Sequence, residues 1–429
     1  MPEKNEFDLK SKLPKAGLID FEFKDGKFFH NKKDYAFFAI WRDSFPFLEE
    51  IRVYLNDNFE VLSETKIIWS EDNLHDNAAR LYEAPIYSNI KKSKRRSGHL
   101  AKIGSNEFIA FVVLDLYPDY GYEVSVSKNI ELSNRNVIKA KYQFRDWVKN
   151  QGGPSYAIHS TNNIQEFCFQ APLVFGYQLL KKIIGKEKLI PSELNKDLEG
   201  AVGWDSYLDL FNMLNLGADY LILRNFESLP DENPEADLDL LTDNYQRLAS
   251  LIGMEQSPTK PYKGVIIVAG EEVKIDIRFL GDEYFPAKWQ QSMLSNKIFN
   301  GLLFHPRYDD YFFSLLYHCK IHKFQVKPTY NVKLSNLARQ LQLTWFTPSQ
   351  LDDDYNMGKI LAGYFKSHQL IYQNPIDDAV GKNRSMIPYL PQSKDRVPQE
   401  KIKMKVKRKL IAILPKNIIS LLQKIKGKF

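Results

Sequence analysis

Cysteine is scarce in this chain of 429 residues, which contains only Cys168 and Cys319. Two cysteines cannot build the disulfide framework of a small secreted domain, and their scarcity fits a reducing cytoplasm. The sequence also lacks an unbroken run of about 18 apolar residues, the length that a membrane-spanning helix requires. Its charged first residues, MPEKNEFDLKSK, lack the apolar stretch of a secretory signal. We therefore expect a cytoplasmic protein.

Acidic residues are absent from residues 401–429, which contain nine Lys and one Arg. The whole chain carries a net charge of +6, so the residues before this tail sum to −4. Apolar residues alternate with the lysines, and few aromatic rings are present to stack on bases. We favour binding to an anionic inner membrane surface over electrostatic binding to nucleic acid, with a solvated tail as the alternative. A shorter basic run, residues 91–96, is interpreted as a solvated loop.

The length exceeds what one ordinary core supports, and an apolar content of 44% indicates a globular chain. Apolar runs alternate with helical patterns, which predicts an α/β (α+β) protein. We divide it into a lead-in (1–33), a first domain (34–190), a second domain (200–330), a helical extension (331–372), a linker (373–400) and the tail (401–429). The linker is predicted from its four prolines, Pro375, Pro388, Pro391 and Pro398.

Three carboxylates are embedded in apolar segments of the second domain. Asp237 and Asp239 alternate with leucines in residues 236–241, and Asp276 lies between isoleucines in residues 273–277. On a strand, alternate residues share a face, so Asp237 and Asp239 point the same way. Carboxylates gathered at one sheet edge repel one another, and Mg²⁺, which shares its shell with substrate phosphates, relieves that repulsion. The pattern therefore favours phosphate chemistry.

An apolar run at residues 219–226, a turn-rich loop, the Asp-x-Asp strand, a helix and a strand with a third Asp follow in that order. Residues 203–330 thus resemble the nucleotidyltransferase fold of the DNA polymerase beta superfamily. The resemblance implies that Asp237 and Asp239 hold two metals and that Asp276 completes the site and helps to activate the attacking hydroxyl. The family holds the triphosphate with a Gly-Ser pair. This chain has Arg224 and Asn225 at the corresponding place as candidate nucleotide-binding residues, and Arg224 can pair with phosphate instead.

A predicted helix over residues 308–324 contains His318, His322 and Lys323. The two histidines, four residues apart, share a helix face, but the glutamate and third ligand of a zinc site are missing, so zinc is not expected. The nucleotidyltransferase resemblance implies that a helix at this position supplies cations to a triphosphate. Lys323, and with less support His322, can do so, with a surface lysine as the alternative.

Residues 35–176 resemble nucleoside diphosphate kinase. The segments that carry the resemblance are AIWRD at 39–43, Arg145-Asp146, and IHSTN at 158–162. It implies a ferredoxin-like fold in which His159 is the phosphorylated nucleophile, Arg145 clamps phosphate and Thr161 is a neighbouring hydroxyl. Trp41 stands where the family has lysine, and Arg42 is a candidate substitute. These departures favour a retained nucleotide-binding or purely structural domain over active phosphotransfer.

Taken together, the sequence predicts a Mg²⁺-dependent nucleotidyl- or phosphoryl-transferase that uses a nucleoside triphosphate on an unidentified acceptor. The basic tail associates that acceptor with cell-envelope polysaccharide or glycolipid synthesis. Two alternatives stay open: a non-catalytic nucleotide-binding or scaffold protein, and phosphotransfer through a phosphohistidine at His159.

Overall fold

The computed structural model describes residues 33–94, 105–124, 130–231, 233, 236–323 and 326–392, together with the backbone of two short strands, β1 (Phe23–Lys24) and β2 (Lys27–Phe28). The predicted basic tail, the last eight residues of the predicted linker and most of the predicted lead-in lie outside the described residues, as do residues 95–96 of the basic loop. Within the described part, the chain is a mixed α/β structure with two five-stranded sheets.

The first sheet has the strand order β8-β3-β5-β4-β9. Its strands are β3 (Asp34–Trp41), β4 (Glu60–Ile68), β5 (Glu107–Asp115), β8 (Ile158–Ser160) and β9 (Glu193–Asn195). Helix α2 (Leu48–Asn58) connects β3 to β4, and α5 (Arg135–Asn150) lies between β5 and β8. The four strands before β9 therefore form a βαββαβ unit with antiparallel neighbours in the order 4-1-3-2. The apolar runs at residues 35–40, 59–69 and 108–116 predict strands, and β3, β4 and β5 confirm them.

Both faces of this sheet are buried, which explains its continuous apolar runs. Ala36, Phe38 and Ile40 face α2 and α5 in one core cluster. Their neighbours Phe37 and Trp41 face the opposite side and belong to a second cluster. Trp41 is fully buried, and its ring packs 4.5 Å from that of Phe108. A lysine in place of Trp41 would be buried away from water. Position 41 therefore cannot supply the cation that a site like that of the kinase family uses.

The face of the sheet that carries Phe37 and Trp41 is covered by α6 (Ile164–Phe175) and α7 (Tyr177–Ile184). The helical pattern over residues 164–180 predicts one helix, but the structure has two. The break falls at Gly176, whose φ of 77° lies outside the helical region. Between this face and the second sheet lies α3 (Leu74–Leu81).

The second sheet has the order β10-β11-β14-β13-β12. Its strands are β10 (Tyr220–Ile222), β11 (Asp237–Thr242), β12 (Glu255–Gln256), β13 (Lys263–Val268) and β14 (Glu271–Phe279). Strands β11 and β14 are parallel, and the other neighbours are antiparallel. Helix α8 (Tyr207–Gly217) precedes β10 and begins at the predicted cap Ser206, while α9 (Tyr245–Ile252) follows β11.

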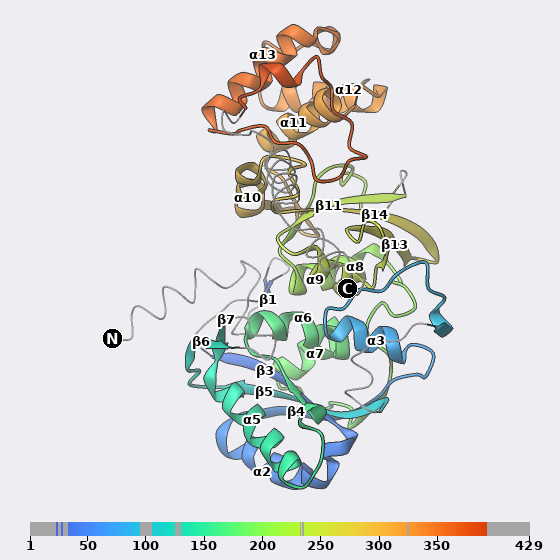
Figure 1. The fold of residues 1–429 in the computed structure, drawn as a ribbon, viewed down its shortest axis with the longest axis vertical. Coiled ribbons are helices and arrows are strands. Elements are labelled where there is room, and N and C mark those ends of the chain that lie inside the picture. The colour runs from blue at the N-terminus through green and yellow to red at the C-terminus, as the bar shows by residue number, and fades with distance from the viewer. Residues whose placement is uncertain are drawn as a thin grey trace, which may run out of the picture.

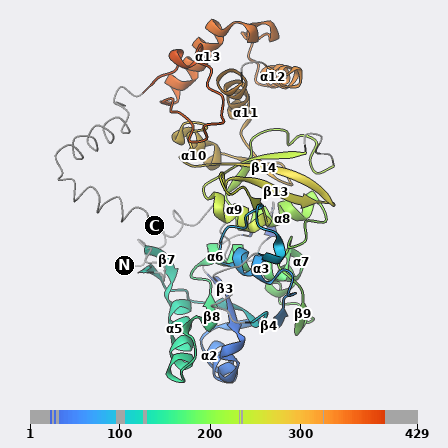
Figure 2. The ribbon, with the colours of Figure 1, turned by 45° about the vertical axis from the view of Figure 1, so that its right-hand side comes forward.

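The two predicted domains share one apolar core. Helix α6 packs against α8, and α3 packs against α9. A single core cluster contains side chains from both sheets and continues into the C-terminal helices. Figure 1 shows the resulting stack, with the first sheet below, the helices in the middle and the second sheet above them, and Figure 2 gives the same order after rotation.

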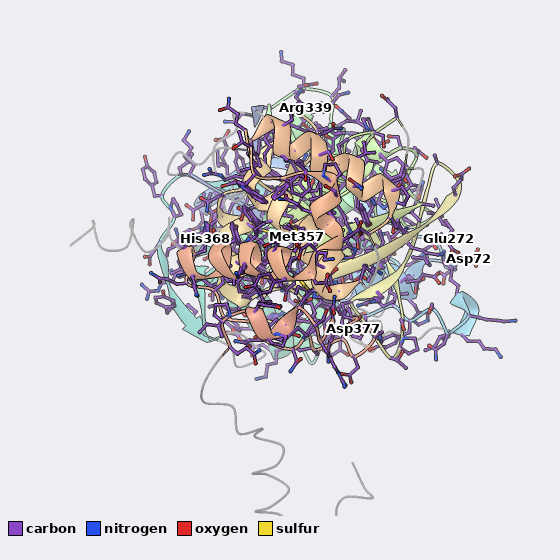
Figure 3. The ribbon with its side chains drawn as sticks, turned by 90° about the horizontal axis from the view of Figure 1, so that it is seen from above. Asp72, Glu272, Arg339, Met357, His368 and Asp377 are labelled. Carbon is purple, nitrogen blue, oxygen red and sulfur yellow. The ribbon has the colours of Figure 1, made fainter. Side chains whose placement is uncertain are left out.

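A helical cap completes the molecule. It contains α10 (Ala287–Ser295), α11 (Tyr308–Tyr317), the π-helix η4 (His318–His322), α12 (Pro328–Gln340) and α13 (Asp354–Ser367). Figure 3 looks down on this cap, with Arg339 on α12 and Met357 on α13. The smaller elements are η1 (Arg42–Phe47), η2 (Lys92–Lys94), β6 (Tyr120–Val124), β7 (Ile130–Asn134), η3 (Ser155–Ala157), β15 (Ile298–Phe299), β16 (Phe304–His305), η5 (Pro348–Asp352) and η6 (Ile387–Tyr389). No helix among the described residues is both long and apolar enough to cross a bilayer.

Residues 373–392, the described part of the predicted linker and here named the strap, return from α13 to the second sheet and η4. Asp377, Met386 and Leu390 are buried, whereas the side chains of a solvated spacer would be exposed. Ile376 N donates to Asp282 O, and Asn383 N donates to Ile321 O. The prolines predict an irregular segment, and the packing of that segment against the body comes from these long-range contacts.

Candidate functional site

The sheet register brings the three predicted carboxylates to one place. In the parallel pair β11 and β14, Asp239 is the register partner of Asp276, and Asp237 is the partner of Lys274. Register partners on adjacent strands project to the same face, and residues two apart on one strand do so as well. The apolar residues between them, Leu238 and Ile275, are buried on the opposite face. The alternation in the sequence therefore gathers Asp237, Asp239 and Asp276 on one surface.

These carboxylates line a pocket of about 740 Å³. Its walls come from β11, β13 and β14, from Arg224 two residues after β10, and from the segment that runs from η4 into α12. Five of its lining residues are cationic: Arg224, Lys263, Lys274, Lys323 and Lys327. The remaining lining residues are Gly264, Ile275, His318 and Tyr330. Five positive and three negative side chains around one cavity favour a polyanionic ligand.

Each of two carboxylates is held by a guanidinium. Arg224 Nη2 lies 2.7 Å from Asp239 Oδ1, and Arg278 Nη2 lies 2.7 Å from Asp276 Oδ2. Lys263 Nζ also approaches Asp276 Oδ2, at 3.2 Å. Burial of Arg224 opposes its charge, but the charge of Asp239, together with Tyr284 and Tyr330, outweighs burial and raises the pKa of the guanidinium. These contacts thus keep Arg224 charged beside the carboxylates.

The carboxylates fit a divalent cation through their remaining oxygens. Asp276 Oδ1 is buried and has no hydrogen-bond partner in the described structure. Among the described residues, no three His, Cys, Asp or Glu side chains form a preformed metal cage. Mg²⁺ seldom uses such a cage, because it keeps water ligands and completes its shell with substrate phosphates. An all-oxygen set of one to three carboxylates beside a phosphate-binding pocket suits that preference.

Lys323, the residue directly after η4, lines the pocket. The predicted helix 308–324 is seen as α11 followed by the π-helix. His318 Nδ1 is hydrogen-bonded to the hydroxyl of Tyr284 at 2.6 Å, and burial followed by the charge of Arg224 lowers the pKa of His318 well below its usual value. His318 is therefore neutral at pH 7. His322 lies deeper, among aromatic rings, and burial also lowers its pKa, so it contributes no positive charge to the pocket.

Asn225 does not line the pocket. Its backbone has a φ of 61°, and its side-chain oxygen accepts a hydrogen bond from Lys333 on α12 at 2.8 Å. Asn tolerates this left-handed conformation better than most residues do. The predicted role of Asn225 in phosphate binding is therefore replaced by a link between the end of β10 and the helical cap.

The candidate residues of the first domain make mainly internal contacts. His159 Nε2 lies 2.7 Å from Gln170 Oε1, and the ring of Tyr82 packs against the imidazole. Arg145 donates through Nε and Nη2 to the backbone oxygen of Ile158, and burial lowers its pKa. These contacts hold β8 against α5 and α6.

The two other candidates of this domain do not complete a phosphate site. Thr161 is buried, and its hydroxyl accepts a hydrogen bond from the backbone N–H of Phe37 at 3.0 Å. Arg42 is largely exposed and lies 3.4 Å from Glu107. Arg42, Arg145 and Thr161 thus each have a contact within the protein that accounts for their position.

Sequence reasoning missed Lys274 and Lys263, which line the pocket, and Arg278, which holds Asp276. Lys274 and Arg278 alternate with apolar residues around Asp276, so the same period of two that singled out the carboxylates could have placed them on its face. Lys263 lies on the neighbouring strand β13, where it is the register partner of Asp276. That register depends on the β13–β14 hairpin, and composition alone does not specify it.

The comparisons with known proteins leave the geometry as the evidence for function. No family model matches the chain, and neither the curated proteins nor the solved structures gave a match.

Proposed function

We propose that the chain is a Mg²⁺-dependent nucleotidyl- or phosphoryl-transferase whose active site is the pocket between β11, β14 and η4. The observation that carries the proposal is the register of Asp239 and Asp276 on adjacent parallel strands, facing a cavity with five cationic side chains. Carboxylates bind the metal, and cationic side chains bind the phosphates. Carboxylates beside cations therefore form a site for a metal–phosphate complex.

The acidic and the basic side chains of the pocket have different roles. Asp237, Asp239 and Asp276 would hold Mg²⁺, which when bound polarises the phosphates and offsets their charge. Arg224, Lys274, Lys323 and Lys327 bind and orient the phosphate oxygens. Asp276 also accepts the proton of the attacking hydroxyl.

The topology supports this assignment. The order α8, β10, Asp-x-Asp strand β11, α9 and the third-carboxylate strand β14 agrees with the order expected of a divergent nucleotidyltransferase. The βαββαβ unit with strand order 4-1-3-2 likewise agrees with the ferredoxin-like expectation for the first domain. The buried contacts of His159, Arg145 and Thr161 favour a structural role for that domain over phosphotransfer.

The acceptor is proposed from charge alone. A basic tail at residues 401–429 would hold the enzyme at an anionic membrane surface, where a glycan or lipid-linked acceptor is presented. The tail lies outside the described residues, so the proposal depends on its composition. Co-sedimentation with anionic vesicles should be lost when residues 401–429 are removed, and persistent binding would direct attention to the basic loop at 91–96.

The decisive experiment measures Mg²⁺-nucleotide binding by calorimetry on the full chain. Each of the four common nucleoside triphosphates is titrated with and without Mg²⁺. D239N and D276N should weaken Mg²⁺-dependent binding by roughly tenfold or more, since even indirect metal contacts cost that much. D378N is the matched control, because Asp378 is fully exposed. Equal binding by D239N, D276N and the wild type would exclude the proposed site.

A second candidate function, nucleotide binding without turnover, is favoured by the Arg224–Asp239 ion pair. One measurement separates the two functions, because a non-catalytic protein binds the nucleotide but releases neither pyrophosphate nor a nucleoside diphosphate over hours. Phosphotransfer through His159 would instead give an acid-labile label from γ-labelled ATP that disappears in H159A.

A further inference from the structure

Asp377 lies outside the sheet yet contacts the cations that hold Asp276. Its carboxylate is 4% exposed. Lys260 Nζ lies 2.5 Å from its Oδ1, and Lys263 Nζ lies 2.9 Å from its Oδ2. Arg278 Nη1 lies 3.7 Å from the same Oδ2. Burial opposes the charge of Asp377, but the hydrogen bonds from Lys260 and Lys263 outweigh it and lower the pKa, so Asp377 is ionised at pH 7.

Two of these cations are shared with the pocket. Lys263 and Arg278 both bind Asp276 through Oδ2 and both bind Asp377 on their other side. With Lys260, the cluster has three cations and two carboxylates and a net charge of +1. Without Asp377, Asp276 would face Lys263 and Arg278 alone, and the cluster would carry a net charge of +2 beside the proposed metal position. A larger positive charge there repels a divalent cation and holds the Asp276 carboxylate more tightly to Lys263 and Arg278.

The strap that carries Asp377 is fixed by independent contacts. Ala379 N donates to Asp377 Oδ1, which closes a local turn around the carboxylate. Asn383 Nδ2 donates to the backbone oxygen of Lys320 at 2.9 Å, within the π-helix that ends beside Lys323. The strap thus contacts two walls of the pocket, β14 through charge and η4 through hydrogen bonds.

We propose that Asp377 is a positioning residue of the active site, which balances Lys263 and Arg278 so that Asp276 keeps one oxygen directed to the metal–phosphate complex. The inference rests on the proposed function of the same pocket. It adds a residue that lies about one hundred positions after Asp276 in the sequence and does not line the cavity.

The test measures Mn²⁺ binding to the full chain, by calorimetry and by the electron paramagnetic resonance signal of free Mn²⁺. D377N should weaken binding roughly tenfold, because one buried negative charge is lost close to the cation. D378N, the same change at the next and fully exposed residue, should bind as the wild type does. Thermal melting of each variant checks that it is folded.

A variant with the opposite sign separates charge from packing. K260Q removes a partly exposed cation that competes with Lys263 and Arg278 for Asp377. The variant should therefore tighten Mn²⁺ binding about twofold. A merely structural strap would predict that D377N and K260Q weaken binding alike. If D377N fails to fold, unchanged or weaker binding by K260Q overturns the inference on its own.

The outcomes distinguish the two proposals. Loss of Mn²⁺ binding in D276N together with wild-type binding in D377N overturns the positioning role and leaves the proposed function standing. Binding that survives both D239N and D276N overturns the proposed function and the positioning role with it.

Discussion

Asp34 is a buried carboxylate of the first sheet whose hydrogen bonds do not offset its burial. It is 1% exposed at the start of β3, and its register partner on β5 is Asp115. Asn134 donates to both carboxylates at 3.0 Å, and the hydroxyl of Tyr120 donates to Asp34. Burial, followed by the charge of Asp115, outweighs these hydrogen bonds and raises the pKa of Asp34 to about 7.

This pKa predicts a specific dependence of stability on pH. Because the folded pKa is above the unfolded value of 3.8, protonation of Asp34 stabilises the fold, and this contribution is lost as the pH rises through 7. The unfolding free energy of the wild type relative to D34N should therefore fall by about 2–3 kcal/mol between pH 5 and pH 8. Urea unfolding at a series of pH values measures the difference. D43N, at an exposed position, is the control, and a pH-independent difference for D34N would contradict the prediction.

At the same scale, the residues of the pocket divide into those that a local pattern reveals and those that it does not. Asp237, Asp239 and Asp276 were predicted because carboxylates alternating with apolar residues have a definite geometry on a strand. Asp377 could not be predicted, because its role depends on Lys263 and Arg278, which meet it only after the chain has passed through the helical cap. Arg224 was predicted to bind phosphate, and in the structure its partner is Asp239.

Among the elements, the break between α6 and α7 depends most clearly on one residue. The helical period continues through Gly176, so periodicity predicts a single helix. The glycine adopts a φ of 77°, and a Cβ added there would collide with the carboxylate of Glu199. Both helices contact α8, and α7 also contacts β4. Periodicity cannot reveal such a break, because both helices keep the same apolar face.

Replacing this glycine tests the cost of the break. G176A should destabilise the protein by about 1–3 kcal/mol, because alanine is strained at this φ and its methyl group meets Glu199. G363A is the matched control, since Gly363 lies within α13 with open space around its Cα. It should stabilise the protein slightly, because alanine favours helix. Thermal melting measures both, and an unchanged midpoint for G176A would show that the chain relaxes around the new side chain.

On the scale of the whole molecule, Arg80 joins the two sheets' helical layers. It is fully buried on α3, and its guanidinium donates to the backbone oxygens of Glu199, Ser250 and Leu251. The last two are at the end of α9, in the second predicted domain. Trp204 Nε1 donates to Ile252 O at 2.9 Å beside them. Burial lowers the pKa of Arg80 to about 10, which leaves it charged at pH 7.

These contacts predict one unfolding unit. Calorimetry of the wild type should give a single transition, because the core is continuous across the two predicted domains. R80A should move that transition to lower temperature with a loss of about 3 kcal/mol, since three buried carbonyl oxygens lose their donor. R339A, an exposed change on α12, should leave it in place. Two separate transitions in the wild type would mean that the layers unfold independently.

The domain boundaries were the least accessible part of the fold from sequence. Apolar runs and caps predicted most strands and helices, among them β3, β4, β5, α5 and α8 at nearly their observed bounds. The same runs do not tell which faces meet, so two domains were predicted where α6 and α8 form one packed layer. The strap was predicted as a spacer because prolines report only a lack of regular structure.

Both sheets end in short strands. The outer strands of the first sheet, β8 and β9, have three residues each, and those of the second, β10 and β12, have three and two. The long strands β3, β5, β11 and β14 all lie inside, with a neighbouring strand on each side. A long outer strand presents a row of free amides on which another chain can add itself and begin a fibril. The outer strands of these two sheets thus offer little backbone on which a strand of another copy can pair. This disfavours aggregation through the two sheets at high protein concentration.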